Sequence, residues 1–121
     1  MTKWILLLAA CLVAGFQTVE PRVTFDEAVR RAKAQPADAR YPYGEKWAIF
    51  NNNNRIDEKK GCYKQSSGPV QQVLVIDNSG VVTNVIADVD NAKSRCFRES
   101  YLHVQFPAPP FAPFYLYLRM R

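Results

Sequence analysis

The chain has 121 residues, of which 48% are hydrophobic and 22% are charged, and its formal net charge is +5 at pH 7. This length accommodates one domain, and the apolar content is sufficient for one hydrophobic core. Three cysteines are too few for a small domain that depends on several disulfides. Acidic residues alternate with the positive charges along the chain, which argues against the concentrated basic patch that a nucleic-acid-binding protein needs.

Residues 1–16 have the pattern of a secretory signal peptide. Lys3 makes the short N-terminal segment basic, and an apolar run extends from Trp4 to Phe16. Val13-Ala14-Gly15 supplies the small or medium side chains of a cleavage site. The run is shorter than the roughly 20 apolar residues that cross a bilayer. The pattern therefore predicts a protein that is periplasmic or secreted after cleavage.

The alternative localisation is at the membrane, as an anchored lipoprotein. Leu8-Ala9-Ala10-Cys11 resembles the lipobox of bacterial lipoproteins, in which the cysteine receives the lipid. Only seven residues separate Lys3 from Cys11, and the apolar run continues beyond Cys11, so the ordinary signal peptide is favoured. Contact with a membrane is expected only if Cys11 is lipidated.

Removal of residues 1–16 leaves two cysteines, Cys62 and Cys96. An even number of cysteines in an oxidising compartment favours a disulfide between them, and two independent buried thiols are the alternative. Closing this loop would stabilise the fold by roughly 3–4 kcal/mol.

Residues 17–44 are expected to form an N-terminal helix and a linker. Thr24 is a suitable N-cap and Glu27 completes a capping box, while Pro36 ends the helix and residues 35–44 form the linker. The asparagine run, residues 51–54, favours a loop or frayed turn. Residues 56–60 are predicted to form a short helix that begins after Asn54 and ends at Gly61.

Residues 45–121 are expected to form one α+β domain. Val70–Ile76 and Val81–Ile86 are rich in β-branched residues and flank the turn Asp77-Asn78-Ser79-Gly80, which predicts a hairpin. A helix should follow from Asp88 or Asp90 to about Val104, stopped by Pro107, with one apolar face formed by Val89, Ala92, Cys96 and Phe97. After the rigid segment 107–113, the residues Phe114–Met120 predict a final strand. The expected fold is a three-stranded antiparallel sheet with helices on one face and one disulfide.

These elements resemble the C-terminal domain of TonB-type energy transducers, in the variant with two cysteines. The resemblance covers about residues 45–120 and is carried by Gly61-Cys62-Tyr63, by the hairpin from Val75 to Val85, by Arg95-Cys96-Phe97 and by Val104-Gln105-Phe106-Pro107. Val104 stands where the family often has Trp. The family also has an uncleaved anchor and a long Pro-rich spacer, which this sequence lacks. The resemblance therefore implies the fold and the disulfide, and a role in TonB-type energy-dependent transport is the least supported of its implications.

The sequence predicts no enzyme, no cofactor and no metal site. His103 is the only histidine, and the expected disulfide removes the thiols that a Cys–His nucleophile would need. Asp77, Asp88 and Asp90 lack the spacing of an EF-hand loop, and turn formation and helix capping account for each of them. A small hydrolase that uses His103 is the least favoured function.

The favoured function is a cell-envelope binding module that engages a protein or peptide, with no role for nucleic acid. If the last strand lies at a sheet edge, it could accept an incoming strand, with contacts from Phe114, Tyr115, Tyr117 and Arg119. The same edge could pair two copies of the chain as a homodimer. The alternative function is a periplasmic inhibitor or immunity-type protein that acts through loops 51–54 and 107–113.

Overall fold

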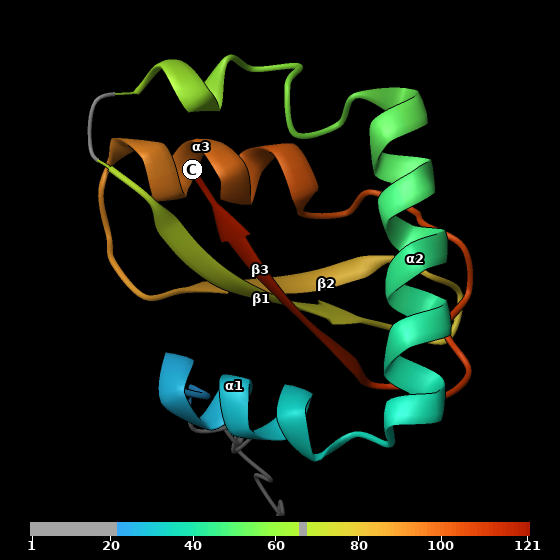
Figure 1. Ribbon diagram of the computed structural model, residues 1–121. Coiled ribbons are helices and arrows are strands. Elements are labelled where there is room, and N and C mark those ends of the chain that lie inside the picture. The colour runs from blue at the N-terminus through green and yellow to red at the C-terminus, as the bar shows by residue number, and fades with distance from the viewer. Residues whose placement is uncertain (1–21, 66–67) are drawn as a thin grey trace, which may run out of the picture.

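The computed structural model describes residues 22–65 and 68–121, so the predicted signal peptide and Cys11 lie outside the described residues. The elements, in chain order, are α1 (Phe25–Ala34), α2 (Ala37–Asn54), the short 3-10 helix η1 (Cys62–Lys64), β1 (Val70–Ile76), β2 (Val82–Ala87), α3 (Ala92–Tyr101) and β3 (Phe114–Met120). Figure 1 shows the sheet between α1 and α3, with α2 across one end of it. The expected α+β class is confirmed.

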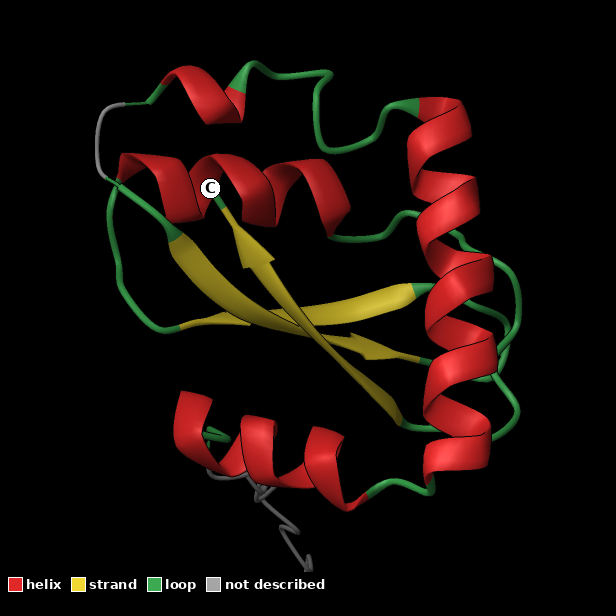
Figure 2. Cartoon of the chain, viewed as in Figure 1, coloured by secondary structure: helices red, strands yellow, loops and turns green. Residues whose placement is uncertain are grey.

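The sheet is antiparallel and has the order β2-β1-β3, so the first strand of the hairpin is central (Figure 2). The hairpin and the final strand are confirmed, and β1 and β3 have the predicted bounds. The turn is held by the Asp77 carboxylate, whose Oδ1 accepts hydrogen bonds from the backbone N–H groups of Ser79 (2.9 Å) and Val81 (3.0 Å). This local bonding explains why the turn was visible in the sequence.

Helices cover both faces of the sheet, which corrects the expectation of helices on one face. Leu74 and Ile76 of β1 belong to the core that includes Phe97 of α3. The opposite face is covered by α1, which packs on β1 and β3 and buries Ala28 and Ala32. Because the central strand carries apolar side chains on both faces, both faces need cover.

A single helix, α2, replaces the predicted linker and the predicted asparagine loop. Tyr43, Trp47 and Asn51 recur at every fourth residue and form its buried face. The Trp47 ring stacks on Phe106 with the centroids 4.7 Å apart. Burial of Tyr43 and Trp47, worth about 2 kcal/mol each, offsets the helix-breaking tendency of Pro42 within the helix.

The helix α2 is capped at its C-terminal end by Arg55, which has the left-handed φ of 51°. Residues 55–60 are turns, so the predicted short helix 56–60 is wrong. Asn54 is the last helical residue, and its side-chain Nδ2 donates to the carbonyl of Phe50 (2.8 Å) instead of capping a following helix.

The helix α3 begins after Asn91, which forms a reciprocal capping box with Ser94, and not at Asp88 or Asp90. It ends at Tyr101 because the following residues pair with β2: His103 N–H donates to the Val82 carbonyl (2.9 Å), and Val82 N–H donates to the Val104 carbonyl (3.0 Å). The prediction that the helix reaches Val104 and stops at Pro107 is therefore wrong. The predicted apolar face is half right: Phe97 is buried and Cys96 packs partly buried against the core, whereas Val89 and Ala92 are exposed. The buried residues of α3 are Lys93, Ser94, Phe97, Ser100 and Tyr101.

The predicted disulfide is confirmed. Cys62 of η1 and Cys96 of α3 are joined by an S–S bond of 2.09 Å, with their Cα atoms 5.5 Å apart. The bond fastens the segment after α2 onto the outer side of α3. Within the described residues, no helix combines the length and the apolar character needed to cross a membrane.

Candidate protein-binding edge

The predicted contact residues lie on β3, which is an outer strand of the sheet. Phe114 is fully buried and packs on the ring of Tyr43 with the centroids 4.6 Å apart, so its side chain belongs to the core. Tyr115 is half-buried, whereas Tyr117 and Arg119 are exposed. The structure therefore leaves three of the four predicted residues at the surface of the edge.

The register of β3 determines which backbone groups point away from the sheet. Leu116 lies opposite Leu74, and Leu118 lies opposite Gln72. In an antiparallel pair, alternate residues bond to the partner strand, and the residues between them direct N–H and C=O outward. The outward residues are Tyr115, Tyr117 and Arg119. The backbone of Tyr115 makes its hydrogen bonds to Gln35, which lies outside the sheet, and this fixes the alternation.

A side-chain amide already occupies the first outward position. Gln35, which follows α1, accepts a hydrogen bond from the Tyr115 backbone N–H through Oε1 (2.8 Å) and donates to the Tyr115 carbonyl through Nε2 (2.8 Å). This is the pair of bonds that a neighbouring strand would make. In residues 22–65 and 68–121, no hydrogen bond from outside the sheet reaches the backbone of Tyr117 or Arg119.

The start of the edge is positively charged. Arg31 of α1 donates to the hydroxyl of Tyr115 (2.9 Å), and this bond, with the nearby Glu27, raises the pKa of Arg31. The Glu27 carboxylate is bound by Arg30 and Arg31, which lowers its pKa. One carboxylate therefore faces two guanidinium groups. Neither Arg31 nor Gln35 was identified from the sequence, because no local pattern indicates bonds to a strand about 80 residues away.

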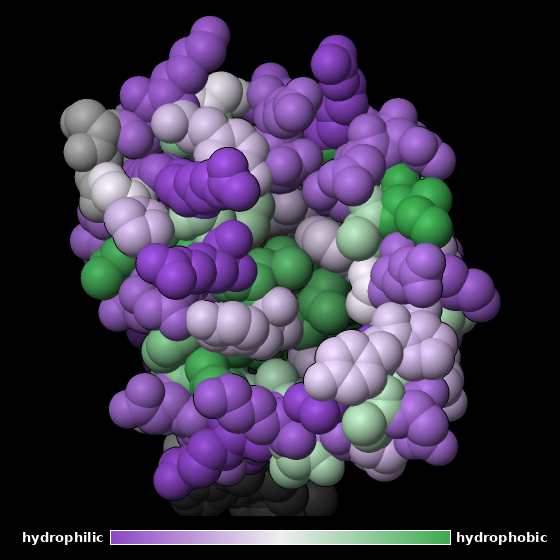
Figure 3. All heavy atoms as spheres, viewed as in Figure 1, coloured by the Kyte–Doolittle hydropathy of each residue, from purple (hydrophilic) through white to green (hydrophobic). Residues whose placement is uncertain are grey.

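Figure 3 shows the face of the molecule on which β3 lies in Figure 1, with apolar atoms in a hollow near the centre and polar side chains around it. Leu116 and Leu118 are only partly buried, and they pack against the core on the α3 side of the strand. The edge of β3 therefore has an apolar side, formed by Leu116 and Leu118, and a polar side, formed by Tyr117 and Arg119.

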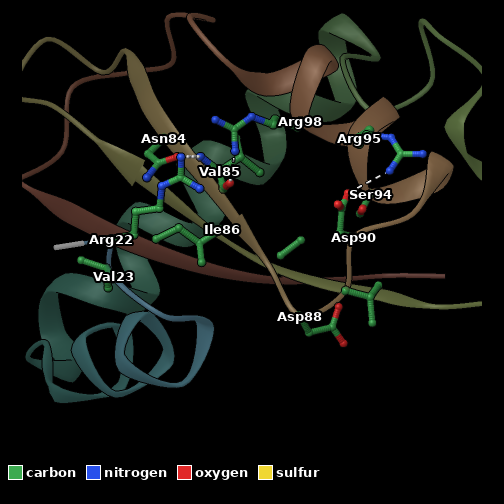
Figure 4. Close-up of a pocket in the computed structure, with 12 residues that line it drawn as sticks. Arg22, Val23, Asn84, Val85, Ile86, Asp88, Asp90, Ser94, Arg95 and Arg98 are labelled. Carbon is green, nitrogen blue, oxygen red and sulfur yellow. Dashed lines mark hydrogen bonds and ion pairs between the residues drawn. The ribbon is translucent and has the colours of Figure 1, made fainter. Parts of the chain in front are cut away.

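The opposite edge of the sheet, formed by β2, is obstructed. Residues 103–105 pair with its beginning, and the Arg98 guanidinium donates to the Val85 carbonyl (3.0 Å) further along. An open cavity of about 780 Å³ lies beside this edge. Figure 4 shows its mixed charges, which come from Arg22, Arg95, Arg98, Asp88 and Asp90. Arg95 is paired there with Asp90 (2.9 Å).

Three tyrosines with raised pKa values use their hydroxyl groups to hold the fold together. Burial raises the pKa of Tyr43 to about 12, and its hydroxyl donates to the Pro107 carbonyl (2.7 Å). Burial also raises the pKa values of Tyr63 and Tyr101. Their hydroxyls belong to one chain of hydrogen bonds that runs through Asn51 and Asp57. This chain ties the end of α2 to η1 and α3.

His103 is exposed, and its backbone has a φ of 69° at the junction between α3 and β2. The described residues contain no cluster of three or more His, Cys, Asp or Glu side chains that could hold a metal ion. Comparisons of the chain with protein-family models, with curated proteins and with solved structures gave no match.

Proposed function

We propose that this protein is a cell-envelope binding module that takes up an extended segment of a partner protein as a fourth strand beside β3. The observation that carries the proposal is the Gln35–Tyr115 pair, in which an amide group already bonds to the outer edge as a strand would. Tyr117 and Arg119 continue that edge, and a peptide backbone would satisfy their outward groups.

The choice of compartment has two supports. Residues 1–16 have the pattern of a signal peptide, and the Cys62–Cys96 bond is consistent with an oxidising compartment. The resemblance of residues 45–120 to TonB-type C-terminal domains agrees with an envelope protein that binds other proteins. The proposal does not extend to energy transduction.

The alternative, an inhibitor that acts through its loops, has less support. Residues 51–54 form the last turn of α2, and Asn51 is buried, so this segment does not project as a loop. The segment 107–113 remains irregular, and only its Phe111 is a large exposed apolar residue.

The test uses a fluorescent heptapeptide of alternating valine and threonine, because its β-strand tendency is high and it carries no side-chain charge. Binding is measured by anisotropy with the purified mature protein. In wild type we expect saturable binding, with slowed amide exchange at Tyr117 and Arg119 in the complex.

Tyr117→Pro removes an outward N–H group but leaves the bonds to β1, so the sheet should persist while binding falls at least about tenfold. Tyr41→Ala, which removes an exposed tyrosine of α2, is the control and should bind as wild type does. Circular dichroism verifies that both variants fold. Equal binding by Tyr117→Pro, or protection of β2 in place of β3, would disprove the proposal. A homodimer that Tyr117→Pro dissociates would identify a second copy of the chain as the occupant of this edge and would also disprove it.

A further inference from the structure

The added strand proposed above would meet two different environments, because successive side chains of a strand point to opposite faces of a sheet. On the α3 side, it would lie beside Leu116 and Leu118, which are only partly buried. This is the side on which apolar atoms line a hollow in Figure 3. Every second residue of the partner would therefore be apolar.

On the α1 side, the added strand would lie beside Tyr117 and Arg119, and it would end next to Tyr115, whose outward backbone groups Gln35 occupies. Arg119 is exposed and makes no ion pair with any other described residue. With Arg121 it lines an open cavity of about 490 Å³ at the end of the strand, together with Gly68 and Pro69. At the other end of the strand stands Arg31, which shares one carboxylate with Arg30. The polar side of the edge therefore carries cations at both ends of β3.

Resting on the proposed function, we infer that the partner segment alternates apolar and acidic residues. The apolar side chains cover Leu116 and Leu118, and the carboxylates face Arg119 and Arg31. Exposed ion pairs contribute little individually, so the charges select among strands whose backbone bonds supply most of the affinity.

The experiment compares three heptapeptides, in which valine alternates with glutamate, threonine or lysine. At low ionic strength we expect the glutamate peptide to bind about three- to tenfold more tightly than the threonine peptide, and the lysine peptide to bind most weakly. The differences should shrink as salt is added, because exposed charges are screened.

Arg119→Gln should reduce the difference between the glutamate and threonine peptides to about twofold or less. Arg95→Gln removes a similarly exposed arginine beside the other edge and should preserve the difference. Equal affinities for all three peptides, or a preference for lysine, would overturn the acidic specificity and leave strand addition intact. If none of the peptides binds, both the specificity and the proposed function fail.

Discussion

At the scale of single residues, Gly80 is the glycine among the described residues that leaves least room for a side chain. Its φ is +93°, and a Cβ at this position would lie 1.9 Å from the carbonyl oxygen of Phe106. The Phe106 N–H in turn donates to the Gly80 carbonyl (2.9 Å), so the hairpin turn and the chain after α3 are in direct contact. Only glycine allows this approach.

Gly80→Ala should therefore lower the free energy of unfolding by about 2–4 kcal/mol, through backbone strain and through displacement of residue 106. Gly44→Ala is the matched control, because Gly44 lies inside α2 with nothing within 4 Å of the added methyl group. It should raise the free energy of unfolding by about 0.5–1 kcal/mol. Urea denaturation measures both variants, and equal stabilities would contradict this account of the turn.

Asp77 makes the same turn sensitive to pH. Hydrogen bonds from Ser79, and then from the backbone of Val81, Ser79 and Gly80, lower the pKa of its carboxyl below 3.8. Because the folded state favours the carboxylate, this contribution to stability is present above the unfolded pKa and is lost as the pH falls through the folded pKa. Asp77→Asn keeps an acceptor oxygen without the charge. The stability difference between wild type and Asp77→Asn should be greatest near neutral pH and should shrink below about pH 3.8. A difference that does not change with pH would show that the charge has no part in the turn.

At the scale of elements, Gln35 fastens α1 to the outer edge of β3. Gln35→Leu removes both bonds to Tyr115 and should cost about 1–2 kcal/mol of folding free energy. Gln35→Glu keeps the acceptor for the Tyr115 N–H but places a carboxylate oxygen against the Tyr115 carbonyl, so an intermediate loss is expected. Amide exchange at Tyr115 should be faster in the leucine variant. Unchanged exchange would mean that the amide pair does not protect this edge.

Elements formed by local signals were predictable, and those formed by distant contacts were not. The hairpin has β-branched strands and a turn bonded within itself, and Phe114–Met120 alternates clearly, so both were found. The helix α2 was missed because Pro42 and the asparagine run are local helix breakers, whereas the stabilising contacts of Trp47 are with Tyr101 and Phe106. The candidate site was predicted only in part for the same reason. The sequence indicated the exposed residues of β3 but not Gln35, whose hydrogen-bond partner is 80 residues away.

At the scale of the whole molecule, the disulfide and the proposed binding edge are separate parts of the structure. The disulfide joins η1 to α3, on one side of the sheet, and the hydrogen bonds of Asn51 and Asp57 hold the same region. Gln35 and Arg31, which contact the edge at Tyr115, belong to the α1 side. Loss of the disulfide should therefore change global stability more than it changes the edge.

Replacing both Cys62 and Cys96 with serine should lower the free energy of unfolding by about 3–4 kcal/mol, because the unfolded chain loses the closure of the loop between two residues 34 positions apart. While the variant remains folded, its affinity for the valine–threonine peptide should stay within about twofold of wild type, since β3 and its contacts with α1 keep their bonds. Denaturant unfolding and peptide anisotropy, measured at one temperature where circular dichroism shows both proteins folded, separate the two effects. A loss of peptide affinity in folded variant protein would show that η1 and α3 help to shape the β3 edge, and would place the disulfide in the binding surface as well as in the core.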